Sequence, residues 1–366
     1  MKINRHYQQC NRCVMDTSDP DIIFDDIGNC NHCNDYLAKL PMVLKTGDQG
    51  RILLDQQIEK ARFAGKGKKY DVIMGLSGGM DSSYVAFNAK KFNLRILVVH
   101  LDNGWNSELS VNNIENCIRY LDADLYTHVI DWEEFKNLQI AYLKAGVIDI
   151  EALTDHAIRS IIYKLTAKYG IEYNLSGSNF ATEGILPNAW VYNKLDFKNI
   201  KAINSRFGAR KIKTFPGMSL GKYIYYRAFA KIKPIDVLNF VDYEVGKARK
   251  EMEENMSWQY YGGKHHESIF TKFYQGFILP EKFGVDKRKA HYSTLICSGN
   301  MSREEAIKLL SKGIYAEDEL AADMEYVLKK LGISEKEFKT IMSQEPIPHL
   351  AYPNNSTLFN FFKQFA

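Results

Sequence analysis

The segment Ser77-Gly78-Gly79-Met80-Asp81-Ser82-Ser83 combines the residue types of a phosphate-binding turn. It follows an apolar run at 72–76 and precedes a stretch with helical spacing. A strand that leads through a glycine turn into a helix presents unpaired backbone N–H groups and the positive end of the helix dipole to an anion. Gly78 and Gly79 let the backbone approach phosphate oxygens, the serines add hydroxyl donors, and Asp81 is suited to hold Mg²⁺. Ordinary strand-to-helix turns also use two glycines, so the glycines alone leave both interpretations open.

Four of the six cysteines form two Cys-x-x-Cys pairs, Cys10 with Cys13 and Cys30 with Cys33. This spacing is typical of a four-thiolate zinc site, because each short gap lets one turn aim both sulfurs at the same ion. Unbound redox pairs and an iron–sulfur cluster are the alternatives. Four thiolates leave zinc no open coordination position, so we predict a structural zinc ribbon in residues 1–40. The two remaining cysteines, Cys117 and Cys297, are interpreted as buried structural thiols.

The elements around these residues follow from apolar periodicity. Residues 37–69 have helical spacing, and the chain then alternates strands with helices. The predicted strands are 72–76, 95–101, 125–130 and 172–175, and the predicted helices are 80–91, 110–121, one from 133, 155–169, 244–254 and 303–310. Continuous apolar strands are typical of a parallel sheet covered on both faces. We therefore predict an α/β fold, an open parallel sheet with helices on both faces, in 41–241, followed by a helical substrate or partner region in 242–366.

Two further turns place polar residues where a predicted strand ends. The second strand ends at Asp102-Asn103-Gly104-Trp105, and a later one ends at Ser176-Gly177-Ser178-Asn179. Ligands bind at the carboxyl edge of open α/β sheets, so Asp102, Gly177 and Asn179 are candidates for the same site as the glycine turn. Asp and Asn at strand ends also often do no more than cap the next helix.

The C-terminal region contains a segment rich in potential ligand residues: Trp258, Tyr260, Tyr261, Gly262, Gly263, Lys264, His265, His266, Glu267, Lys282, Lys287, Arg288, Lys289 and His291. Adjacent histidines usually point to different faces, which disfavours a metal site at 265–266. A basic cluster such as 287–289 is often solvated surface. Cations that reach a phosphate site would instead stabilise departing pyrophosphate, so we take Lys287 and Arg288, with Asp81, as candidate catalytic residues.

Bulk composition is that of an ordinary globular protein. The chain has 366 residues, 45% hydrophobic and 25% charged, with a net charge of +4. This charge is too small to indicate nucleic-acid binding by itself. The N-terminus lacks the apolar core of a signal peptide, and no run of about 18 apolar residues occurs. We therefore expect a cytoplasmic protein that does not enter the membrane.

The heptad 77–83 resembles the pyrophosphate loop of the N-type ATP pyrophosphatases, the PP-loop superfamily with an adenine nucleotide alpha hydrolase-like fold. This superfamily includes GMP synthetase, asparagine synthetase, NAD synthetase and tRNA thiolation enzymes. The resemblance implies that ATP adenylates a substrate oxygen and releases pyrophosphate. It assigns to the ATP site Ser77, Gly78, Gly79, Asp81, Ser82, Ser83, Asp102, Gly177 and Asn179.

A closer resemblance involves four features in order: the paired cysteines, the loop, Leu-Asp-Asn-Gly-Trp at 101–105 and the stretch 265–291. Together they resemble the N-acetyl sugar amidotransferases of bacterial surface-polysaccharide (O-antigen) biosynthesis, over nearly the whole chain. The resemblance implies that an acetamide oxygen on an N-acetyl sugar is adenylated and that ammonia displaces AMP to give an acetamidino sugar. ATP, Mg²⁺ and structural Zn²⁺ are the expected cofactors.

Ammonia needs a source, and the chain has no nucleophile-elbow cysteine of the glutaminase type. The resemblance implies two partners, a glutaminase subunit and a cyclase-like ammonia-channelling subunit, similar to the two halves of imidazole glycerol phosphate synthase. The alternative function is a tRNA-modifying PP-loop ATP pyrophosphatase, which adenylates a base before thiolation or amination. The small charge excess and the commitment of the paired cysteines to metal argue against it. A degenerate scaffold subunit is disfavoured because the loop retains every residue that the chemistry needs.

Overall fold

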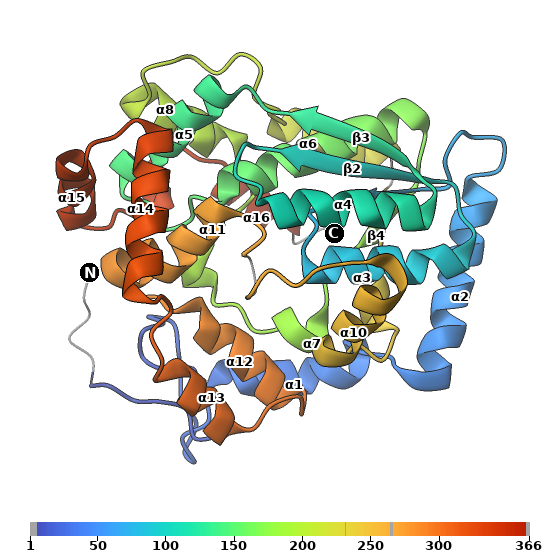
Figure 1. Ribbon diagram of the computed structural model, residues 1–366, viewed down its shortest axis with the longest axis horizontal. Coiled ribbons are helices and arrows are strands. Elements are labelled where there is room, and N and C mark those ends of the chain that lie inside the picture. Colours follow the sequence, from blue (N-terminus) through green and yellow to red (C-terminus); the bar gives the residue numbers. More distant parts are fainter. Residues whose placement is uncertain (1–5, 231, 264–265, 364–366) are drawn as a thin grey trace.

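A five-stranded parallel sheet forms the centre of the computed structural model, which describes residues 6–230, 232–263 and 266–363 (Figure 1). The strands lie in the order β3-β2-β1-β4-β5 and pair in parallel throughout. Their bounds are β1 Val72–Gly75, β2 Ile96–Asp102, β3 Asp124–Val129, β4 Tyr173–Ser176 and β5 Lys233–Asp236. The chain proceeds outward from β1 to β3 and then resumes at β4 on the other side of β1. The crevice between β1 and β4 is therefore the switch point at which ligands bind in such sheets.

Helices connect and surround the strands. In the first part of the chain they are α1 Asn31–Val43, α2 Gly47–Ala64, α3 Met80–Ala89, α4 Glu108–Leu121, α5 Trp132–Ala145, α6 Ala152–Tyr169, α7 Phe180–Glu183, α8 Phe197–Phe207 and α9 Leu220–Tyr225. After β5 they are α10 Val245–Met256, α11 Ile269–Phe273, α12 Lys287–Cys297, α13 Arg303–Leu310, α14 Glu317–Leu331, α15 Glu335–Ser343 and α16 Ser356–Lys363. None of the described helices is both long and apolar enough to cross a bilayer.

The sheet has a hydrophobic core on each face, because side chains alternate along its apolar strands. Ile73 and Leu97 pack into one core with residues of α5 and α6. Met74 and Val98 pack into the other with residues of α2, α3, α4 and α10. In Figure 1, α3 and α4 lie in front of the sheet and α6 lies behind it. The predicted parallel sheet with helices on both faces is confirmed.

The helical stretch predicted at 37–69 was wrong as a single unit, because the structure divides it into α1 and α2. Leu44 has an extended backbone, and the backbone N–H of Lys45 donates to the Asn239 carbonyl, at 2.8 Å. This tertiary hydrogen bond replaces the helical one at the break, and Thr46 then precedes α2 as its N-cap residue.

The strand β5 was not predicted from the sequence. It is four residues long and contains Pro234, which cannot donate to a neighbouring strand. An edge strand tolerates proline, and β5 pairs on one side only, with β4. The predicted helices of the C-terminal region, 244–254 and 303–310, correspond to α10 and α13.

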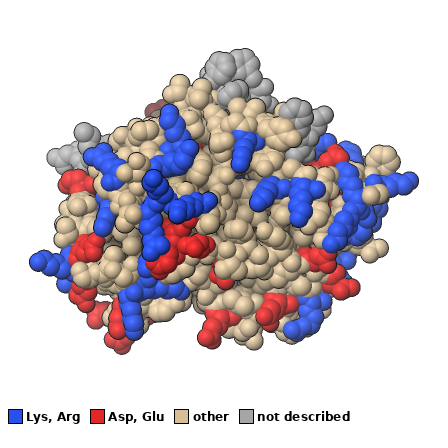
Figure 2. All heavy atoms as spheres, turned by 90° about the horizontal axis from the view of Figure 1, so that it is seen from above, with Lys and Arg blue, Asp and Glu red and all other residues tan. Residues whose placement is uncertain are grey.

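Charged residues are mixed over the face seen from the top of Figure 1. Figure 2 shows Lys and Arg side chains on both sides of this face, with Asp and Glu among them and a largely uncharged surface between. The described residues therefore form no continuous basic surface on this face.

Candidate active site and metal centre

The glycine turn follows β1 and leads directly into α3 at Met80. Gly78 has φ +79°, and a Cβ there would overlap the carbonyl oxygen of Ser110, so the turn requires glycine. Ser82 Oγ accepts from the Ser77 N–H at 3.3 Å, and Ser77 Oγ accepts from the Gly79 N–H at 3.2 Å. The serines thus hold the turn in shape, while the first turn of α3 points its N–H groups toward it.

Aromatic side chains from the segment after β5 hold the loop from outside. Trp258 Nε1 donates to Ser83 Oγ at 3.1 Å, and Tyr261 Oη accepts from the Met80 N–H at 2.8 Å. The Tyr243 hydroxyl donates to Asp81 Oδ1. Burial, followed by the charge of Asp81, raises the pKa of Tyr243, so this hydroxyl remains a donor. Tyr243 was missed in the sequence, where nothing local connects it with Asp81.

The polar residues at the other strand ends have distinct positions. Gly177 lies against the loop, since a Cβ there would be 3.4 Å from the Ser82 nitrogen. Asn179 is the N-cap of α7, and its Oδ1 accepts from the Thr182 N–H at 2.7 Å. Asp102 Oδ1 accepts from the Gly104 N–H at 2.9 Å. Asn179 and Asp102 thus make the local hydrogen bonds of a cap and a turn, and their assignment to an ATP site stays a prediction.

A cavity of about 750 Å³ opens at the carboxyl edge of the sheet. Ser77 lines it from the loop, His100 and Asn103 from the end of β2, and Thr154 from α6. The C-terminal region supplies the opposite wall, with residues that include Glu267, Ser268, Gln275, Lys287, Arg288 and His291. The other predicted ATP-site residues lie outside this lining. The sheet domain and the C-terminal region thus form opposite walls of this cavity.

The three consecutive cations 287–289 do not act as one group. Lys287 Nζ lies 3.6 Å from Glu151 Oε2, within the cavity wall. The Arg288 guanidinium binds Asp286 at 2.8 Å and donates to the Lys312 carbonyl at 3.0 Å. Lys289 forms an ion pair with the buried Asp16 at 2.5 Å. Successive residues of a helix point about 100° apart, which explains the divergence. In the histidine pair, His266 lines the cavity, whereas Lys264 and His265 lie outside the described residues.

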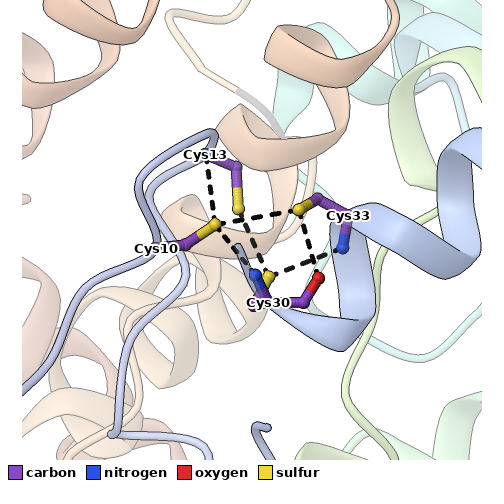
Figure 3. A group of neighbouring side chains, drawn as sticks. All are labelled: Cys10, Cys13, Cys30 and Cys33. Carbon is purple, nitrogen blue, oxygen red and sulfur yellow. Dashed lines mark hydrogen bonds between the residues drawn. The ribbon is translucent and has the colours of Figure 1, made fainter. Parts of the chain in front are cut away.

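The four N-terminal cysteines converge on one point (Figure 3). All four are fully buried, and their sulfurs lie within 4.8 Å of one another. The Sγ atoms of Cys10 and Cys33 are 3.7 Å apart, and those of Cys13 and Cys30 are 3.6 Å apart. A tetrahedral site with Zn–S bonds of about 2.3 Å needs sulfurs about 3.8 Å apart. The cluster therefore fits the structural zinc predicted from the sequence.

The candidate metal-binding segment, residues 10–33, packs against the C-terminal region. The Val14 N–H donates to Ser293 Oγ of α12 at 3.1 Å, and Arg303 of α13 donates to the carbonyls of Cys13 and Cys10 at 3.1 and 3.0 Å. In Figure 1, α12 and α13 lie beside α1. The helix that carries Lys287 into the cavity is thus attached to the cysteine cluster.

The two remaining cysteines differ from each other. Cys117 is fully buried in α4, where burial raises the pKa of its thiol to about 11. Its interpretation as a buried structural thiol is confirmed. Cys297 is only partly buried, at the end of α12 near Cys33. The prediction of a buried thiol was wrong for Cys297, which is the last residue of α12 and is only partly covered there.

Comparison with known proteins finds a family match in the C-terminal region. Residues 267–366 match the family described as "LPS biosynthesis protein WbpG-like, C-terminal domain". The C-terminal part of the chain is therefore similar to this family, and the match does not extend to residues before 267. No curated protein sequence matches the chain.

The chain is also similar to several solved structures. An NH3-dependent NAD synthetase from Campylobacter jejuni is 16% identical, with a TM-score of 0.33, over 71% of this chain and 96% of that one. An NMN synthetase from Francisella tularensis is 13% identical, with a TM-score of 0.30, over 66% and 92%. A predicted subunit of a tRNA methyltransferase from Methanocaldococcus jannaschii is 14% identical, with a TM-score of 0.27, over 49% and 72%. At these scores the fold assignment rests on the sheet order and the loop described above.

Proposed function

We propose that the protein is an ATP-dependent amidotransferase that converts the acetamide of an N-acetyl sugar into an acetamidine for a bacterial surface glycan. The observation that carries the proposal is the shared cavity. Ser77 of the glycine loop lines one side of it, and residues of the WbpG-like C-terminal domain line the other. An activating loop and a domain of a lipopolysaccharide-biosynthesis family therefore meet at one site.

The proposed reaction has two steps. The acetamide oxygen attacks the α-phosphorus of ATP, and pyrophosphate leaves. Ammonia then adds through its lone pair to the activated carbon, the C–O bond breaks, AMP leaves with the former amide oxygen, and loss of a proton gives the acetamidine. An acetamide is a poor electrophile, so the first step supplies a good leaving group for the second.

The loop suits the first step because serine hydroxyls and the N–H groups at the start of a helix are donors of the kind that bind phosphate oxygens. Asp81 is the proposed carboxylate that would hold Mg²⁺ beside them, and the Tyr243 hydroxyl donates to one of its oxygens. Lys287 is the candidate cation on the opposite wall of the cavity, and the Glu151 carboxylate orients it. Arg288 fits a positioning role better, because its guanidinium joins α12 to the end of α13.

The proposal requires ammonia from a separate protein. A glutaminase needs an accessible thiolate, and Cys117 is fully buried, so its thiol does not fit that role. Cys297 lies against the metal-binding segment. A glutaminase subunit and a cyclase-like channelling subunit are the proposed partners.

The test is sugar-dependent release of pyrophosphate from MgATP and ammonium, with a panel of nucleotide-linked N-acetyl sugars and, in parallel, tRNA. We expect release with at least one sugar and none with tRNA. Asp81→Asn should lower the rate at least a hundredfold, whereas Asp122→Asn, at the C-cap of α4 and not in the glycine loop, should leave it unchanged. Release that depends on tRNA and on no sugar would replace the proposal with the base-modifying function.

A further inference from the structure

Two polar side chains at the carboxyl end of β2 face the cavity as a pair. His100 lies within β2, only 7% exposed, and Asn106 lies in the turn that follows. Both line the cavity together with Ser77 of the loop. His100 Nδ1 is 3.0 Å from the Leu76 carbonyl oxygen, and His100 Nε2 is 3.1 Å from Asn106 Nδ2.

These contacts determine the orientation of the Asn106 amide. A carbonyl oxygen can only accept, so His100 Nδ1 carries a hydrogen and donates it to Leu76. Burial lowers the pKa of His100, which keeps the ring neutral and makes Nε2 an acceptor. Asn106 must then donate to Nε2 through Nδ2, so its Oδ1 points to the other side of the amide. That oxygen accepts no hydrogen bond from any described residue.

The backbone of Asn106 is fixed by the beginning of the WbpG-like domain. Asn106 and Ser268 form an isolated antiparallel bridge. On either side of it, the Ser107 N–H donates to the Glu267 carbonyl at 2.9 Å and the Ile269 N–H donates to the Trp105 carbonyl at 3.0 Å. The amide is therefore held at its backbone by the C-terminal domain and at its side chain by the sheet.

We propose that Asn106 Oδ1 accepts a hydrogen bond from an N–H of the reacting nitrogen compounds, and that His100 is the positioning residue that turns this oxygen into the cavity. The inference rests on the proposed function and specifies a binding group of the same site. Two compounds in that reaction carry such hydrogens, the incoming ammonia and the acetamido group of the sugar.

A neutral amide oxygen suits this role chemically. It accepts an N–H without protonating the nitrogen, so the lone pair of ammonia stays available for the activated carbon. A hydrogen bond fixed on the far side of the nitrogen also directs that lone pair away from Asn106. Carboxylates in the same wall, such as Glu151, are already paired with cations or amides.

The experiment has a binding arm and a kinetic arm. In the binding arm, ¹⁵N-labelled histidine and asparagine side chains are observed by NMR while ammonium or acetamide is added to the full-length protein. We expect His100 as the neutral Nδ1–H tautomer at pH 7, and a shift of the Asn106 amide signal, identified through its loss in Asn106→Ala. An Nε2–H tautomer, or an Asn106 signal that neither probe moves, would overturn the inference even without turnover.

The kinetic arm compares variants in pyrophosphate release with the sugar that supports it. Asn106→Ala should raise the KM for ammonium or for the sugar about tenfold, the effect of one lost hydrogen bond, and the affected substrate identifies the donor. His100→Phe should have the same effect. His100→Gln should restore most of the affinity, because a glutamine can donate to Leu76 and accept from Asn106. Asn116→Ala, at a partly exposed asparagine on α4 that donates to the Ser257 carbonyl, is the matched control.

The two proposals fail in different ways. If wild-type protein releases no pyrophosphate with any sugar, the proposed function fails while the binding arm still decides the role of Asn106. If release is normal and Asn106→Ala retains both KM values, the role of Asn106 is wrong and the proposed function stands.

Discussion

The cysteine cluster and the glycine loop are both short turns that gather polar groups, but one is closed and the other is open. The four thiols are fully buried, and backbone N–H groups such as those of Cys13 and Cys30 point at their sulfurs. The loop lies beside a cavity of about 750 Å³, and Ser77 lines it. A closed set of groups can only hold structure, whereas an open one can bind a ligand. The helix α12 connects them, because it touches the metal-binding segment at Ser293 and the cavity at Lys287.

Metal removal should have the largest effect, because a closed metal site contributes its binding free energy to folding. In isolated zinc fingers this contribution is on the order of 10 kcal/mol. We expect about one zinc per chain, and Cys13→Ser should lose it together with the hydrogen-exchange protection of 287–297. Cys117→Ser, a buried cysteine outside the cluster, should retain the metal. Full hydrogen-exchange protection of α12 in metal-free protein would mean that this helix folds independently of the cysteine cluster.

The loop should tolerate an added methyl group far less than another left-handed turn does. Gly78 and Gly67 have φ +79° and +78°, but a Cβ at Gly78 meets the Ser110 carbonyl, whereas one at Gly67 meets no atom within 4 Å. Gly67→Ala should therefore cost only the left-handed strain of about 1–2 kcal/mol in unfolding free energy. Gly78→Ala should cost about 2 kcal/mol more and weaken ATP binding. Urea unfolding measures the loss of unfolding free energy, and ATP titration measures the loss of affinity. If the two alanine variants lose the same unfolding free energy, the loop is not tightly packed.

The features that could be predicted from the sequence are those specified within a short segment. The loop, the cysteine pairs and the apolar strands β1 and β2 each have their pattern in consecutive residues. Tyr243 lies 162 residues from Asp81, and Asn106 acquires its orientation from His100 and its backbone position from Ser268. Such contacts depend on tertiary pairing. The cations 287–289 show the opposite limit. They are adjacent in the sequence and were grouped there as one basic cluster, but on a helix they point in different directions and bind different partners.

Two buried histidines resemble the buried cysteines in being shielded from solvent, and acid should destabilise the fold by protonating them. Burial lowers the pKa of His156 and of His349 from the usual 6.5 to about 4. Each ring accepts a backbone N–H at Nε2, from Met218 and Asp149 respectively, which a protonated ring cannot do. Because the unfolded chain binds these protons first, stability is lost as pH falls from about 6.5 to 4, by about 3 kcal/mol for each histidine at pH 4.

Chemical denaturation between pH 7 and 4 measures this loss. His156→Gln and His349→Gln keep a donor and an acceptor but do not titrate, so each should remove its share of the pH dependence. The difference from wild type isolates the histidine, because the carboxylates titrate in both proteins. If a variant loses unfolding free energy with falling pH as steeply as the wild type does, the histidine it replaces is already solvated in the native state.

The smallest expected effect concerns the ion pair between Asp16 of the metal-binding segment and Lys289 of α12, and it tests whether this pair helps to attach the helix to the segment. Asp16 is fully buried and also accepts from the Ser18 N–H at 3.0 Å, and Lys289 of α12 forms an ion pair with it at 2.5 Å. A double-mutant cycle with Asp16→Asn and Lys289→Met should give a coupling of about 1–2 kcal/mol in unfolding free energy. The exposed pair Lys339–Glu335, at 3.5 Å, should give less than about 0.5 kcal/mol in the same cycle. If the two couplings are equal, the Asp16–Lys289 pair is screened by solvent as strongly as an exposed pair and contributes little to the attachment of α12. The hydrogen bonds of Val14 and Arg303 would then be the contacts that attach the C-terminal region to the metal-binding segment, because a strongly screened ion pair adds almost no free energy.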